Sequence, residues 1–195
     1  MSSSPAVEQE RPLRADARRN RERVLAAARD VLAEHGLDAQ MDQIAAAAGV
    51  GVGTVYRHFP TKEALVAALV ADRWRSLAEQ AGPAFEADDA WVGLHDFLWR
   101  CARLQLENRA WAELTAGGPL ASEGEDEHRE LLDVTQRLVD RAREAGAVRD
   151  DLTGRDIGML MCGTCSVMRT TGGHDGDRSW ERFLELALEG LRPRA

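Results

Sequence analysis

The chain has 195 residues and a net charge of −8, with 44% hydrophobic and 30% charged residues. This composition is ordinary for a soluble globular protein and excludes a disordered chain, and no segment approaches the roughly 20 apolar residues of a membrane span. The first residues lack the apolar core of a signal peptide, and the three cysteines form no disulfide framework, so we expect a cytoplasmic protein with no membrane partner.

The N-terminal third predicts a polar segment followed by three helices. Residues 1–14 are polar and contain Pro5 and Pro12, so we expect a flexible basic arm there. A helix is predicted from about Asp16 to Gly36, because apolar residues recur there at three- and four-residue spacing: Val24, Leu25, Ala28, Val31 and Leu32. Two short helices follow over about 41–48 and 52–59, joined by Gly49-Val50-Gly51 and closed by Pro60.

The rest of the chain predicts longer helices over about 62–82, 88–107, 122–144, 153–171 and 179–191, with a short piece near 109–116. Thr61 suits an N-cap, and Ser122 and Glu125 have capping-box spacing. No strand-like alternation occurs, so we expect an all-α fold. Its expected parts are a three-helix helix-turn-helix domain at 15–62, a connecting helix at 63–82, and a larger helical effector-binding and dimerisation domain at 83–195.

The two short helices have the geometry of a helix-turn-helix, whose second helix enters the major groove of DNA. Gly53 would let the start of that helix approach a phosphate without a Cβ in the way. Thr54 and Tyr56 offer hydroxyl groups to phosphates or base edges, and Arg57 is long enough to reach guanine. His58 and Lys62 follow where backbone phosphates would run.

The charge distribution also favours DNA as a partner, although the whole chain is acidic. Residues 1–62 hold nine basic and eight acidic residues, whereas the rest carries a net charge of −9. What matters for phosphate binding is a local basic surface. Arginines crowd between Arg11 and Arg29, and we expect some of those between Arg18 and Arg23 to meet phosphates, although such runs are often only a solvated helix face.

Residues 18–75 closely resemble the TetR family, both in the segment from Ile44 to Leu65 and in the helix from Arg23 to Gly36. The resemblance implies a dimeric DNA-binding regulator, usually a repressor, that a small ligand in the C-terminal domain releases from its operator. It implies phosphate contacts for Thr54, Tyr56, His58 and Lys62, and operator reading by Val52 and Arg57. The expected DNA-binding set is Arg18, Gln43, Val52, Gly53, Thr54, Tyr56, Arg57, His58 and Lys62. Two departures, Gly51 for serine and Gln40 for threonine or serine, each remove an expected helix cap.

The sequence gives only weak signals for a redox, metal or catalytic site. Cys162 and Cys165 have redox spacing but lie in a helix without a βαβ pattern, where such cysteines are more often packing residues. The histidines show no ligand spacing and no nucleophile–base set is recognisable, so we expect no metal, no cofactor and no enzyme. A thiol redox sensor acting through Cys162 and Cys165, or an activator of the same family, remains the alternative hypothesis.

Two further sets are expected in the C-terminal domain. Tryptophan, methionine and cysteine residues of this domain fit either the hydrophobic core or an adaptable pocket for an unidentified apolar or aromatic effector. They are Trp91, Trp99, Trp111, Met159, Met161, Cys162 and Met168. The uncharged segment 157–168 must be covered on more than one face, so we expect the last two long helices to pair with those of a second copy in a four-helix bundle. The residues expected at that interface are Gly158, Gly163, Trp180, Leu184, Leu188 and Leu191.

Overall fold

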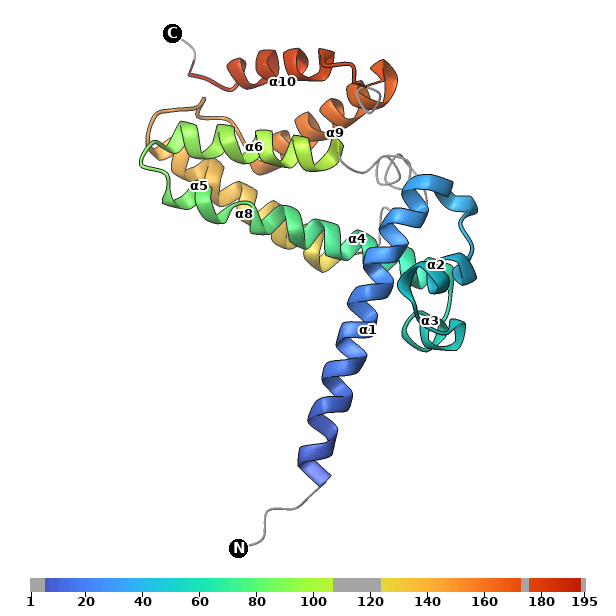
Figure 1. Ribbon diagram of the computed structural model, residues 1–195. Coiled ribbons are helices and arrows are strands. Elements are labelled where there is room, and N and C mark those ends of the chain that lie inside the picture. Colours follow the sequence, from blue (N-terminus) through green and yellow to red (C-terminus); the bar gives the residue numbers. More distant parts are fainter. Residues whose placement is uncertain (1–5, 107–123, 173–175, 194–195) are drawn as a thin grey trace, which may run out of the picture. The chain divides into compact units, whose positions relative to one another are not determined.

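The computed structural model describes residues 6–106, 124–172 and 176–193, with side chains from Asp16 onward except that of Leu37. These residues form helices and no strand, which confirms the predicted all-α fold. The chain divides into two compact units, Met1–Leu69 and Val70–Ala195. Figure 1 shows the helices of both units.

The N-terminal unit contains α1 (Ala6–His35), the short 3-10 helix η1 (Gly36–Asp38), α2 (Met41–Ala48), α3 (Val52–His58) and the start of α4 (Lys62–Glu79). α1 packs against both α2 and α3. The buried face of α1 is the one that the apolar spacing predicts. The core of the unit is formed by Val24, Leu25, Ala28, Leu32, Ile44, Val55, Phe59 and Leu65.

The predicted start of the first helix was wrong. α1 begins at Ala6, so residues 6–14 are helical where a flexible arm was expected. The sequence of these residues shows no apolar periodicity and includes Pro12, which lacks a backbone N–H donor. Without a periodic signal the first turns of α1 could not be predicted.

The turns of this unit follow the sequence closely. Gly49 ends α2 in the left-handed region, with a φ of 63°, and its N–H bonds the Ala46 carbonyl at 3.1 Å. Thr61 caps α4 as predicted, because its Oγ1 accepts a hydrogen bond from the Ala64 N–H at 3.1 Å.

The C-terminal unit contains the rest of α4, α5 (Gly82–Glu86), α6 (Ala90–Leu106), α8 (Glu125–Glu144), α9 (Gly154–Thr171) and α10 (Ser179–Glu189). α6 packs against α5, α8 and α9, while α9 also packs against α8 and α10 (Figure 1). These contacts bury Ile157, Thr164 and Met168 of the uncharged stretch of α9, whereas Met159 and Cys162 stay exposed. None of the described helices is long and apolar enough to cross a membrane.

The helix α5 was not predicted, because Gly82-Pro83 indicates only the end of the preceding helix. Proline is well tolerated in the first turn of a helix, and here it lies in the first turn of α5. α6 approaches α5 so closely that a Cβ on Gly93 would lie 2.4 Å from the Ala84 carbonyl oxygen. Glycine at position 93 is thus a packing requirement.

The starts of α8 and α9 differ in how well they were predicted. α8 begins at Glu125 with Gly124 as its N-cap, and Ser122 lies outside the described residues, as does the short helix predicted near 109–116. α9 has a full capping box, in which Thr153 Oγ1 accepts from the Asp156 N–H and Asp156 Oδ2 accepts from the Thr153 N–H at 2.9 Å.

Candidate functional site

One face of α3 is buried and the other is open. Val55 and Phe59 lie in the core of the N-terminal unit and fix the helix to α1 and α2. On the opposite face Val52 is 41% exposed and Tyr56 48% exposed, with Arg57 also exposed. A seven-residue helix thus presents valine, tyrosine and arginine side chains to a partner.

Packing does not explain the glycines at the start of α3. A Cβ on Gly51 or Gly53 would meet nothing within 4 Å. Gly51 is the N-cap residue and makes no side-chain cap, as expected from the sequence. Because Gly53 lies on the open face, the absence of a side chain leaves the backbone of α3 accessible from solvent.

The structure places six of the predicted DNA-binding residues on α3, with Lys62 four positions beyond it. Arg57 Nη2 donates to Thr54 Oγ1 at 3.4 Å, so these two polar groups lie side by side on the helix. His58 is half-buried, with its ring centroid 6.3 Å from that of Phe59. Lys62 is the first residue of α4.

The arginines expected to meet phosphates divide into two groups. Arg23 Nη2 donates to the carbonyls of Ala48 and Gly49, at 2.6 and 3.2 Å, and so caps the C-terminal end of α2. Arg21 lies over the Phe59 ring, 5.4 Å from its centroid. Both hold the helix-turn-helix together, whereas Arg18 stays exposed beside Glu22.

Gln43 has a structural role that the sequence did not reveal. Its Oε1 accepts a hydrogen bond from the Gln40 N–H at 2.7 Å. The first turn of α2 is therefore capped through Gln43, and the predicted loss of a cap at Gln40 is offset. Gln43 remains exposed, on the same unit as the open face of α3.

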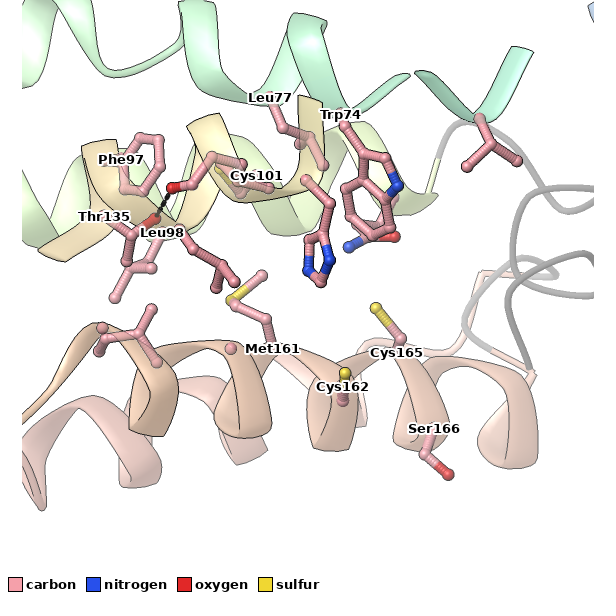
Figure 2. Close-up of a pocket in the computed structure, with 18 of the residues that line it drawn as sticks. Trp74, Leu77, Phe97, Leu98, Cys101, Thr135, Met161, Cys162, Cys165 and Ser166 are labelled. Carbon is pink, nitrogen blue, oxygen red and sulfur yellow. Dashed lines mark hydrogen bonds between the residues drawn. The ribbon is translucent and has the colours of Figure 1, made fainter. Parts of the chain in front are cut away.

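The C-terminal unit encloses a cavity of about 420 Å³ between α4, α6, α8 and α9. Figure 2 shows Trp74 and Leu77 entering it from α4, opposite Met161 and Cys165 of α9. Most of its wall is apolar and includes Phe97, Leu98, Leu131, Leu132 and Ile157. Its size and character are those of a small-molecule site.

All three cysteines of the chain line this cavity. Burial raises the pKa of the Cys101 thiol to about 12 and that of Cys165 to about 11. Both thiols are therefore neutral near pH 7, where a redox thiol needs thiolate character. Among the described residues no group of histidine, cysteine or acidic side chains is placed to hold a metal ion.

Only part of the predicted pocket lines the cavity. Met161 and Cys162 do, but Met159 is 59% exposed and Met168 is buried in the core. Trp91 and Trp99 lie elsewhere on α6, where both rings approach His95, and Trp99 also contacts Trp180. Trp111 lies outside the described residues.

The apolar stripe expected at the dimer interface does not lie on the surface of the chain. Its members on and after α10 lie in the core of their own chain: Trp180, Leu184, Leu188 and Leu191. Gly158 lines the cavity, and Gly163 lies against Phe183 of α10. The exposed apolar residues on these two helices are instead Met159, Phe183 and Leu186.

Several residues of the cavity were not predicted from the sequence, including Trp74, Phe97, His128, Cys165 and Arg169. A usable signal existed on α9, where the lining residues recur at three- and four-residue spacing from Gly154 to Arg169. That signal shows only which residues share a face, and the neighbouring helices decide what the face encloses.

Comparison with known proteins agrees with this architecture. Residues 24–69 match the family model described as bacterial regulatory proteins, tetR family, and residues 89–193 match that of the SbtR-like transcriptional regulator C-terminal domain. The HTH-type transcriptional repressor Rv1474c of Mycobacterium tuberculosis is 28% identical over 187 residues, which cover 89% of this chain and 81% of that protein.

Two crystal structures of TetR regulators are similar over nearly their whole length. SCO0520 from Streptomyces coelicolor is 32% identical, with a TM-score of 0.67, over 90% of this chain and 99% of that one. The protein from Mycobacterium vanbaalenii is 35% identical, with a TM-score of 0.66, over 93% of this chain and 99% of that one.

Proposed function

Because the chain belongs to the TetR family of DNA-binding transcriptional regulators, we propose that it is a homodimeric repressor that a small-molecule effector releases from a palindromic operator. The open face of α3 carries this proposal. The buried side chains of Val55 on α3 and of Phe59 directly after it hold the helix in place, and its exposed residues are those that can contact phosphates and base edges.

The sign of regulation is proposed from the relatives. Rv1474c, which is similar to 89% of this chain, is named a repressor. A reporter experiment tests this directly. A duplex selected by the purified protein, placed over a bacterial promoter, should lower reporter output when the chain is expressed. A rise in output would make the protein an activator, and no change in either direction would contradict regulation through that site.

The effector site we propose is the cavity of the C-terminal unit. Trp74 belongs to α4, the helix that begins at Lys62 shortly after α3. A molecule that contacts Trp74 therefore contacts α4, the helix whose first residues belong to the DNA-binding unit. A ligand shifts such an equilibrium only through a difference in its affinity for the two states, so binding of effector and of operator should oppose each other.

The dimer surface we propose is the exposed apolar patch of α9 and α10, namely Met159, Phe183 and Leu186. A single short recognition helix reads too few base pairs to specify a site, and paired copies solve this on a palindrome. A charge in a buried interface is strongly unfavourable. Leu186→Glu should therefore yield a monomer by light scattering.

The matched control is Val92→Glu on α6, where the parent valine is also exposed. It introduces the same charge outside the patch and should leave the dimer intact. A Leu186→Glu protein that still pairs, or a parent protein that is monomeric at micromolar concentration, would contradict this surface.

A further inference from the structure

The cavity in the C-terminal unit has an apolar part and a polar part along α9. Its first lining residues on this helix, such as Ile157 and Met161, are apolar. The later ones are Cys165, Ser166 and Arg169. Arg169 Nη2 lies 3.3 Å from Ser166 Oγ, so guanidinium and hydroxyl groups meet at this end.

His128 of α8 lies toward the polar part of the cavity, because α8 and α9 run in opposite directions. The Gly154 N–H donates to Gln136 Oε1 at 2.7 Å, and one turn further along α9 the Cβ position of Gly158 is 3.8 Å from Leu132 Cδ2. One further turn along both helices brings His128 of α8 level with Cys162 of α9. The His128 ring stacks on Trp74 with centroids 4.8 Å apart.

The charges around the cavity have one sign. Among the described residues that line it, Arg169 carries a permanent charge and none is aspartate or glutamate. Burial and the neighbouring Cys162 raise the pKa of Cys165, and Arg73 and Arg169 oppose this rise.

We infer that the effector is a hydrophobic carboxylate, with its apolar body among the aromatic and aliphatic side chains and its anionic group toward Arg169 and His128. This inference rests on the proposed function, since it treats the cavity as the effector site. A guanidinium donates to a carboxylate in a charge-assisted hydrogen bond, and a histidine ring has at least one N–H donor in either protonation state. A lipophilic cation would meet positive charge and no counter-ion on the described wall.

The test uses three probes with one naphthalene body and different head groups: naphthaleneacetate, naphthaleneethanol and naphthylethylammonium. Calorimetric titration of the purified parent protein should give the tightest binding for the carboxylate. A hydrogen bond to a charged group contributes about tenfold or more in affinity. The alcohol should bind about tenfold more weakly than the carboxylate, and the ammonium compound more weakly still.

Arg169→Gln removes the charged group that we propose to bind the carboxylate. Because Arg169 is exposed, the substitution should not prevent folding. It should reduce naphthaleneacetate binding about tenfold and leave the alcohol within about twofold. Arg155→Gln is the matched control, because Arg155 is also exposed on α9 but does not line the cavity. It makes the same change in net charge and should leave all three affinities unchanged.

Three results would overturn the inference: ammonium binding equal to or tighter than carboxylate binding, equal loss in the Arg169 and Arg155 variants, or no binding by any probe. The proposed function is tested separately, by binding of the same protein to selected duplex DNA. A protein that binds its duplex but does not prefer the carboxylate would refute only the effector class. Absence of DNA binding would refute the proposed function whatever the calorimetry gives.

Discussion

Replacing Gly53 by alanine should move stability and DNA affinity in opposite directions. Position 53 lies in the first turn of α3, and a Cβ there would meet nothing within 4 Å of the free protein. Alanine is favoured over glycine in a helix by roughly 0.5–1 kcal/mol, because glycine loses more backbone freedom on folding. The free Gly53→Ala protein should therefore be more stable by about 0.5 kcal/mol, which raises Tm by about 1–2 °C at this chain length.

DNA binding should weaken in the same variant if α3 approaches the duplex through its open face. The new methyl group would separate the helix from a phosphate that backbone N–H groups contact. Loss of one hydrogen bond to a charged group costs about 1.5–3 kcal/mol, so affinity should fall at least about tenfold.

Thermal unfolding followed by circular dichroism gives the first quantity, and fluorescence anisotropy with a selected duplex gives the second. Gly82→Ala is the control for DNA affinity, because Gly82 also lies in the first turn of a helix with open space around its Cβ position but belongs to the C-terminal unit. It should leave DNA affinity unchanged, and it carries no stability comparison because Pro83 disfavours the helical conformation of a preceding residue that has a Cβ. A Gly53→Ala protein that binds the duplex as tightly as the parent would refute close approach at this position.

Three further predictions concern single side chains. Tyr56→Ala should weaken binding to all duplexes alike, as expected for a phosphate contact, and equal affinity of parent and variant in anisotropy would contradict that contact. Thr153→Ala should lower the free energy of unfolding by about 1 kcal/mol in urea titrations, because it removes the N-cap of α9, and an unchanged midpoint would show that the cap contributes nothing. At pH 8, iodoacetamide should alkylate the exposed Cys162 well before Cys165, whose rate should rise as the pH approaches its pKa of about 11; equal rates in mass spectrometry would contradict the burial of Cys165.

The local features of the helix-turn-helix could be predicted from the sequence because local chemistry determines them. Gly49 and Pro60 end α2 and α3, Thr61 caps α4, and the buried spacing on α1 identifies its core face. The roles of Arg23 and Gln43 could not be predicted in this way. Arg23 caps a helix 25 residues away, and only the packing of α1 on α2 brings it there.

The C-terminal unit shows more clearly what the spacing of apolar residues cannot predict. The stripe containing Leu184 and Leu188 was correctly identified as apolar, but a stripe does not say which surface covers it. In the structure the stripe is covered by its own chain, and the exposed Leu186, two positions from both Leu184 and Leu188, is the residue we propose for pairing. For the same reason the sequence could not show that Trp99 packs against Trp180 whereas Trp74 lines the cavity.

The central claim is that α3 reads DNA sequence through its open face, with Arg57 as the residue that reaches a base edge. Selection of binding sites from random duplex DNA, run side by side on the parent protein and on Arg57→Ala, tests it most directly. The parent should enrich a pseudo-palindrome whose half-sites lie about one helical turn apart, and the variant should enrich the same palindrome with one position relaxed in each half-site, where a base contact is worth about 1–3 kcal/mol. No enrichment by the parent, or identical motifs from both proteins, would contradict the account.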